Sequence, residues 1–335
     1  MTALPVRTRE CEAGLQWRLE EVSAQVLVML VLLAVLILVT SLVDPNFFRS
    51  ISQRGLWRDV AVLSLFALGQ AVVIISGGID LSVGSLLCFT GSLTIVLLKA
   101  GNLTFIEAGL IVLALAAMIG LVHGSLVCFL NLPPFLVTLC SLLFFRGLSR
   151  VLTRDSTVSF NPSEQPLFAS LGQDTWFGIP LAMYLLIGAL APLACFMHFS
   201  VPGRYLFAIG YNLEAARFSG VRVNSLRIFS YVLCALLTTV AAFIEASSVG
   251  SMTPSTAGTA YEMYGITAAV LGGCTLRGGE GSLIGVITGA AILRVIRSMV
   301  IFLNISTYWT YAVTGLVLLA AIIADAVVRR RRKGI

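Results

Sequence analysis

The sequence predicts an all-α, polytopic membrane protein with about ten transmembrane helices. Of its 335 residues, 58% are hydrophobic and 11% are charged, whereas an ordinary soluble domain carries about 25% charged residues. Apolar segments, most of them long enough to cross a bilayer, follow one another along the chain and are separated by short polar, glycine-rich or proline-containing segments. A soluble fold has no polar shell to cover so much apolar surface, so we expect lipid to be the solvent.

The first half of the chain contains five predicted spans. We expect the first to be retained rather than cleaved as a signal peptide, because no small-residue cleavage site follows it. Residues 47–59, which come next, combine Phe48 and Trp57 with three arginines, a pattern typical of an interfacial amphipathic segment. The five spans are residues 22–43, 60–76, 84–98, 106–130 and 135–152.

The second half begins with the polar loop 154–177 and contains five further predicted spans. A second polar segment, 201–227, follows the first of them, and the glycine-rich residues 272–281 interrupt a later apolar region. The apolar segment before those glycines is short for a span. The five spans are residues 178–199, 228–250, 260–271, 282–303 and 307–328.

The distribution of basic residues predicts that both termini are cytoplasmic. With the N-terminus inside, the loops and tails on the inner side carry thirteen Lys and Arg residues, and the outer loops carry five. In this orientation residues 1–21 and 329–335 are cytoplasmic tails of one transmembrane domain, 22–328. The segment 201–227 is then a cytoplasmic loop, and 154–177 lies outside.

The cytoplasmic loop is predicted to contain a short helix. Asn212 occupies an N-cap position, Glu214 lies in the first turn where the helix dipole favours an acid, and Gly220 is typical of a C-terminal stop. Glu214 and Arg217 are three residues apart and can pair on one face. A helix of about two turns is not stable alone in water, so we expect it to dock against another protein.

Motifs for covalent chemistry are absent from the sequence. There is no G-x-x-x-x-G-K-[ST] P-loop for ATP, and the two histidines do not form the HExxH motif of a zinc hydrolase. The seven cysteines are dispersed and form no CxxC pair. We therefore expect a protein that is not an enzyme and binds no metal or cofactor. The excess of arginine is expected to set membrane topology rather than to bind nucleic acid.

Two glycine breaks and a few charged residues are candidates for a solute path. The break at 76–85 is either a tight turn capped by Asp80 or Ser82 or part of the path, and the two interpretations are compatible. Charged side chains within spans usually mark function, although Arg294 and Arg297 could instead snorkel or pair between helices. The candidates are Gly77, Gly78, Asp80, Ser82, Gly84, Arg146, Gly272, Gly273, Arg294 and Arg297.

Four sequence blocks, in order and with matching spacing, resemble the permease subunits of bacterial ABC importers for ribose and related simple sugars. The resemblance extends from about residue 45 to 325. The blocks are ISGGIDLSVGS (75–85), NLPPFLVTLCSLLFFRGLSRVLT (131–153), GRYLFAIGYNLEAARFSGV (203–221) and AAVLGGCTLRGGEGSLIG (268–285).

The resemblance implies an ABC importer permease fold of ten spans in the bacterial inner membrane, dimerised with a copy of itself or a paralogue around a central path. It further implies that a periplasmic sugar-binding protein delivers the solute to the side of loop 154–177. A cytoplasmic ATPase with two fused cassettes would power transport through the short helix. The residues implied in coupling are Gly203, Arg204, Asn212, Glu214, Ala215, Ala216, Arg217 and Gly220.

Other solutes and other mechanisms stay open at this point. A related permease would carry a branched-chain amino acid or a nucleoside. Arg294 and Arg297, where the family pattern leads us to expect neutral residues, leave room for an acidic or phosphorylated sugar. An ion-coupled secondary transporter would need an intramembrane carboxylate, for which Asp80, Glu245 and Glu262 are the candidates, all near span ends. A receptor or scaffold without transport has no feature in its favour.

Overall fold

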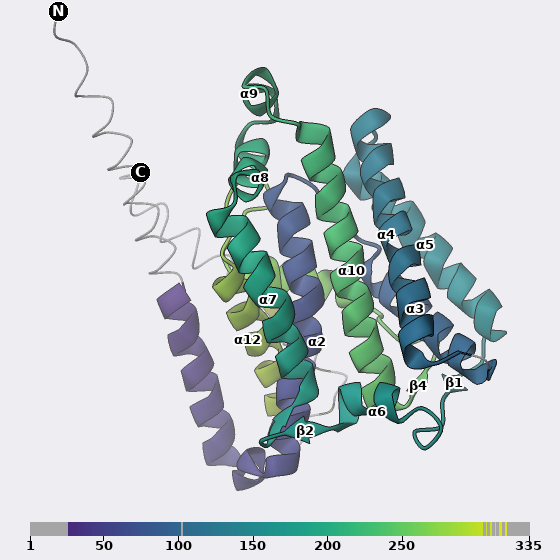
Figure 1. Ribbon diagram of the computed structural model, residues 1–335. Helices are drawn as coiled ribbons and strands as arrows, with labels where there is room; N and C mark the ends of the chain where they lie inside the picture. The colour runs from purple at the N-terminus through teal and green to yellow at the C-terminus, as the bar shows by residue number, and fades with distance from the viewer. Residues whose placement is uncertain are drawn as a thin grey trace, which may run out of the picture.

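The computed structural model describes residues 26–101 and 103–303, together with residues 306, 309, 312, 315, 316 and 319. Within these residues, seven helices are long and apolar enough to cross a membrane, and they lie roughly side by side (Figure 1). The seven are Val26–Val43, α2 (Ser50–Ile75), α4 (Phe105–Phe129), α5 (Pro134–Thr153), α7 (Leu181–Phe199), α10 (Val223–Val249) and α12 (Leu283–Phe302).

Two shorter apolar helices belong to the same bundle, α3 (Val83–Lys99) and α11 (Tyr261–Leu271). The 11 residues of α11 cover about 16 Å, roughly half of the hydrocarbon core of a bilayer. The helix ends at Gly272, where a side chain would overlap the backbone of Gly285 in α12. Helix α11 is therefore a half-span that packs against α12 and α2.

Helices α2 and α10 form the centre of the bundle. Figure 1 shows α3, α4 and α5 on one side of α10, with α2, α7 and α12 on the other. Small residues allow the central helices to approach closely, as in many membrane bundles. A methyl group at Gly69 would lie 2.8 Å from the Cα of Cys234, and one at Gly120 would lie 2.5 Å from the Cα of Val232. These contacts fix α2 and α4 against α10.

Short elements cover the two ends of the bundle (Figure 1). One end carries α8 (Val201–Tyr211) and α9 (Leu213–Phe218). At the opposite end, an antiparallel strand pair joins the loop after α5 to the loop after α10. The elements at that end are α6 (Pro166–Gln173), the pair β1 (Val158–Ser159) and β4 (Ser251–Met252), and the pair β2 (Thr175–Trp176) and β3 (Ile179–Pro180).

Each of the first nine predicted spans coincides with a helix, but two boundaries were wrong. Helix α2 begins at Ser50, after the short 3-10 helix η1 (Pro45–Phe48), so most of the segment predicted to be interfacial is the first part of a span. Helix α10 begins at Val223 and so includes the end of the predicted cytoplasmic loop. The predicted tails lie outside the described residues, as does most of the tenth span. The number of ten spans and the cytoplasmic termini stay predictions.

Candidate functional site

Helix α9 is a short, capped helix at one end of the bundle. The Oδ1 atom of Asn212 accepts a hydrogen bond of 3.0 Å from the backbone N–H of Ala215, which satisfies one of the free N–H groups of the first turn. At the other end Gly220 has a φ of +79°, and the N–H of Val221 donates to the carbonyl of Ala216 over 3.2 Å. This is the geometry of a glycine stop, at the residues that the sequence predicted.

The outer face of α9 is charged and aromatic. Glu214 and Arg217 approach to 3.6 Å with side chains 63% and 50% exposed, and Phe218 is 87% exposed. On the opposite face Ala216 is buried in a small apolar cluster with Ile209 of α8. Ala216 and the partly buried Leu213 thus anchor the helix, while Glu214, Arg217 and Phe218 are exposed.

Gly203 and Arg204 lie in a separate helix, α8, so the predicted coupling region consists of two helices. The Ser200 hydroxyl caps α8 by accepting a hydrogen bond of 3.0 Å from the N–H of Gly203. A methyl group at Gly203 would lie 2.7 Å from the Cα of Met197, so glycine allows the chain to turn closely from α7 into α8. Arg204 is exposed.

Close to α8, three chain segments meet at glycines. The N–H of Gly279 donates to the carbonyl of Ile75, at the end of α2, over 2.9 Å. A side chain at Gly210 of α8 would overlap both groups, and one at Gly278 would place its Cβ 3.0 Å from the Cα atoms of Gly210 and Gly77. We call this contact the glycine junction. It holds α8 in direct backbone contact with both glycine breaks.

Of the glycines in this junction, only Gly77 was a candidate from the sequence. Gly210, Gly278 and Gly279 were missed because their partners are distant along the chain. Gly278 and Gly279 belong to the second break, which Gly273 enters with a φ of +96°. Positive φ favours glycine. The glycines in the sequence therefore predict that the helix is interrupted here, but they do not predict which segments pack against the interruption.

The first break is a turn capped by Asp80. The Oδ1 atom of Asp80 accepts hydrogen bonds from the N–H and the hydroxyl of Ser82, over 2.8 and 2.6 Å. Gln70 donates to the carbonyl of Asp80 over 2.7 Å, and a methyl group at Gly78 would lie 2.5 Å from the hydroxyl of Tyr231. Asp80 is 1% exposed. From Asp80 to Ser85 the break is therefore buried in protein, as non-helical backbone in a membrane must be, whereas Gly77 is exposed.

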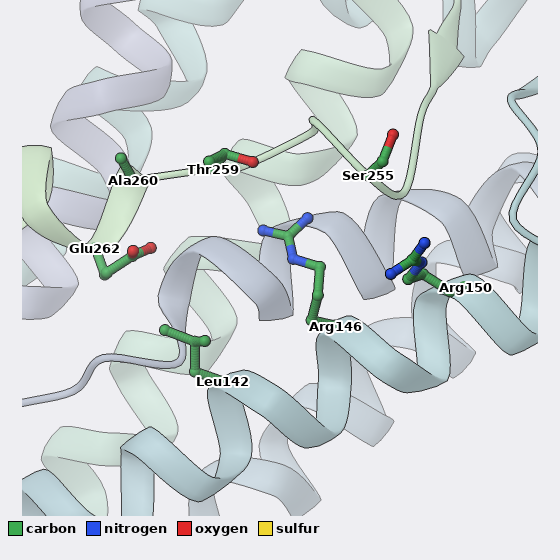
Figure 2. A pocket seen from close by; sticks show the side chains of 7 residues that line it. All are labelled: Leu142, Arg146, Arg150, Ser255, Thr259, Ala260 and Glu262. Atoms are coloured by element: carbon green, nitrogen blue, oxygen red, sulfur yellow. The ribbon is translucent and has the colours of Figure 1, made fainter. Parts of the chain in front are cut away.

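A polar pocket lies between α5 and the segment that leads into α11 (Figure 2). Its volume is about 310 Å³, at the small end of the range for ligand sites. The sequence predicts Arg146 as a path residue, and it offers Glu262 only as an ion-coupling carboxylate. We call this cavity the outer pocket, and it is lined by Leu142, Arg146, Arg150, Ser255, Thr259, Ala260 and Glu262.

Arg146 and Gly84 both hold the segment 253–260 in place. One terminal nitrogen of Arg146, Nη1, donates to the carbonyls of Pro254 and Ala257 over 2.9 and 2.6 Å. Gly84, at the start of α3, lies against Gly258 so closely that a side chain on either residue would overlap the backbone of the other. The end of the first break and the segment after α10 thus meet inside the bundle.

Arg150 is engaged by an acid at the rim of the outer pocket. Its guanidinium donates two hydrogen bonds, of 2.8 and 2.7 Å, to the carboxylate of Asp155. These hydrogen bonds, together with the positive charge of Arg150, hold the pKa of Asp155 below its ordinary value. The pair is exposed, so its two charges face water and balance one another.

Arg294 and Arg297 do not act together, although they are one turn apart. Arg294 is 5% exposed, and its guanidinium carbon lies 5.6 Å from the ring centre of Tyr261. The Tyr261 hydroxyl in turn donates to Glu245 over 3.0 Å. Arg297 is exposed. Neither arginine lines the outer pocket, so the structure separates them from Arg146.

The chain is similar to known proteins over nearly all of its length. The sequence model of the family described as "Branched-chain amino acid transport system / permease component" matches residues 55–322. The ribose import permease protein of Escherichia coli strain K12 is 37% identical over 313 residues, which cover 92% of this chain and 94% of the relative. The L-arabinose transport system permease protein of the same strain is 34% identical over 299 residues, 89% of each chain. A probable ABC transporter permease protein of Sinorhizobium fredii is 33% identical over 328 residues, 98% and 95% of the two chains.

Proposed function

We propose that this chain, which belongs to the family of branched-chain amino acid transport system permease components, is the membrane-spanning subunit of an ATP-binding-cassette importer for a simple sugar. The observation that carries the proposal is the 37% identity to a ribose import permease over 94% of that protein. The chain is a transport component rather than an enzyme, and the seven apolar helices suit a protein of the bacterial cytoplasmic membrane. It binds no cofactor itself, and ATP and Mg²⁺ belong to a partner.

The partners follow from the two ends of the bundle. On the cytoplasmic side, an ATPase with two fused cassettes docks on α9, whose outer face carries Glu214, Arg217 and Phe218. A periplasmic sugar-binding protein docks at the opposite end, over loop 154–177 and the strand pairs. A second permease chain, identical or paralogous, completes the path. These assignments are supported by the exposure of α9 and by the resemblance of the sequence.

The mechanism is alternating access driven through α9. When ATP closes the cassettes, their movement displaces α9 and, through Ala216 and Ile209, α8. The glycine junction transmits this displacement to the end of α2 and to the second break, because the backbones are in contact with no side chain between them. The bundle then opens toward the binding protein, and ATP hydrolysis resets it.

A branched-chain amino acid is the second candidate substrate, because the family's description names it. Two of the three relatives described above are named for ribose and arabinose instead. A phosphorylated or acidic sugar loses support, since Arg294 lies under Tyr261 and Arg297 does not line the outer pocket.

The test of substrate class is uptake into proteoliposomes that contain this chain, its cognate ATPase and its binding protein. We expect ATP-dependent uptake of a labelled pentose such as ribose or arabinose, and none of labelled leucine. Uptake of leucine without uptake of either pentose would contradict the sugar assignment while leaving the importer class intact.

A further inference from the structure

The outer pocket brings together charged side chains from α5 and α11. Arg146 lies on α5, whose mean hydropathy is high enough for a membrane span. Glu262 lies in the first turn of the half-span α11. Charged residues within membrane segments usually face a water-filled cavity and mark a substrate pathway. Figure 2 shows both side chains directed into the space between α5 and the segment 253–260.

The charges of the outer pocket balance, which decides against an anionic ligand. Arg150 is held by Asp155 through two hydrogen bonds. Arg146 and Glu262 are the other two charged residues that line the pocket, one of each sign. Two arginines are therefore matched by two carboxylates, and the pocket offers no excess charge to a phosphate or carboxylate.

Arg146 has little capacity left to bind a ligand through the nitrogen that faces the segment 253–260. Its Nη1 atom already donates to the carbonyls of Pro254 and Ala257. Besides the other guanidinium nitrogens of Arg146, the pocket offers Glu262 and the exposed hydroxyls of Ser255 and Thr259, which within the described residues are not hydrogen-bonded to another side chain. A carboxylate that accepts and hydroxyls that both donate and accept suit a neutral solute rich in hydroxyl groups.

Glu262 also lies beside the closest backbone contact of this region. A side chain at Gly84 would overlap the Oε2 atom of Glu262 as well as the carbonyl of Gly258. The carboxylate is thus held over the point where the start of α3 meets the segment before α11. A solute that binds Glu262 would therefore lie next to the contact between Gly84 and Gly258.

We propose that the outer pocket is a transient binding site for one neutral, polyhydroxylated solute molecule, with Glu262 as the acceptor of its hydroxyl hydrogen bonds. Ser255 and Thr259 supply further polar contacts, and Arg146 is a positioning residue that fixes the wall carrying them. This inference rests on the proposed function, in which a sugar is handed to the permease from outside. A site open to water with few polar contacts binds its solute weakly. Weak binding suits a transient site, because the solute must be released again for transport to continue.

The test compares variants of the pocket in proteoliposomes with the ATPase and a pentose-loaded binding protein. Glu262→Ala is expected to lower the initial rate of pentose uptake by about tenfold, the size of effect that follows the loss of a hydrogen bond to a charged group. Glu262→Gln keeps one acceptor oxygen and should retain an intermediate rate. The matched control is Glu107→Gln, at an exposed carboxylate outside loop 154–177 whose capping bond to Thr104 glutamine can also make.

A second variant keeps the test informative should Glu262→Ala fail to fold. Thr259→Trp fills the pocket from an exposed position, whereas Thr256→Trp places the same side chain on the same loop outside the pocket. We expect uptake to be lost only in Thr259→Trp, with ATP hydrolysis still stimulated by the binding protein. Full uptake by both Thr259→Trp and Glu262→Ala would overturn the pocket assignment. Absence of pentose uptake by the wild type would instead overturn the proposed function.

Discussion

Gly84 and Gly258 approach so closely that neither position has room for a methyl group. The overlap at Gly84 involves the carbonyl of Gly258 and the carboxylate of Glu262, and a backbone carbonyl cannot rotate away as a flexible side chain can. Gly147, in α5, is the opposite case, because nothing lies within 4 Å of the position that its Cβ would take.

Gly84→Ala is therefore predicted to lower the free energy of unfolding by about 1–3 kcal/mol, as overpacking of a tight contact does. Gly147→Ala should leave stability unchanged or raise it by up to about 1 kcal/mol, because alanine favours the helix. Thermal unfolding of the two purified variants in detergent measures the difference. Equal melting temperatures for Gly84→Ala and the wild type would show that the two backbones are not in contact.

Arg146 is predicted to hold the segment 253–260 against α5. Arg146→Lys keeps the charge, but the lysine ammonium is a compact charge on a flexible stem and lacks the fixed, planar geometry with which the guanidinium donates to the two carbonyls. Loss of a hydrogen bond to a charged group costs about 1.5–3 kcal/mol, so amide hydrogen exchange in this segment should become at least about tenfold faster. Arg150→Lys is the control, since Arg150 binds Asp155 rather than the segment. The same acceleration in both variants would argue against a specific role for Arg146.

Local chemistry of single residues could be predicted from the sequence, and their distant partners could not. Asp80, Ser82 and Asn212 carry short polar side chains beside helix starts, and their capping bonds span two or three residues. The contact of Gly78 with Tyr231 joins residues 153 positions apart. Such contacts depend on how helices pack, which no single local pattern specifies.

At the scale of elements, α9 depends on its N-cap more than a longer helix would. With six residues it has few internal hydrogen bonds, so Asn212→Ala should destabilise it by about 1 kcal/mol. We expect weaker binding of the ATPase, measured as a several-fold rise in the Kd between the two purified subunits. Asn212→Ser, which can still cap, should restore most of the affinity. Failure of serine to restore it would assign Asn212 to direct contact with the partner instead.

The boundaries of elements were the least predictable feature at this scale. Helix α2 starts at Ser50, directly after the 3-10 helix η1 that Asp44 caps, so Arg54 and Arg58 lie within the helix, although their charge indicated an interfacial segment. The coupling region divides into α8 and α9 because Asn212 takes an extended conformation, with φ −156°. Spans were predictable because each is a long apolar run. Their ends are set by capping and by neighbours.

The orientation of the whole molecule in the membrane is a prediction from its basic residues. Phe177 and Phe218 are fully or largely exposed and lie in the polar segments at opposite ends of the bundle. In intact cells, a membrane-impermeant maleimide should label Phe177→Cys, whereas Phe218→Cys should be labelled only after permeabilisation. Both variants are made in a parent chain in which the exposed Cys140 and Cys195 are replaced by serine. Labelling of that parent chain gives the background from its remaining cysteines. The reverse pattern would invert the topology.

Composition alone decided the class of the molecule, because a chain with 11% charged residues cannot cover its apolar surface with a polar one. Composition does not predict the partners with which the chain assembles. The ATPase, the binding protein and the second permease chain are inferred from exposed α9, from the opposite end of the bundle and from similarity to known importers. The outer pocket escaped prediction because its seven residues come from two segments more than 100 positions apart.

The central claim is that α9 couples this permease to a separate ATPase, and the most direct measurement is pentose uptake by the Glu214→Arg variant. In proteoliposomes with the ATPase and binding protein, we predict that wild-type uptake requires ATP. The variant should lose both uptake and stimulated ATP hydrolysis while folding normally, because the outer face of α9 has reversed its only acidic charge. Lys99→Glu, which reverses an exposed charge outside both α9 and loop 154–177, is the control. Wild-type uptake that proceeds without the ATPase and follows an ion gradient would contradict the account.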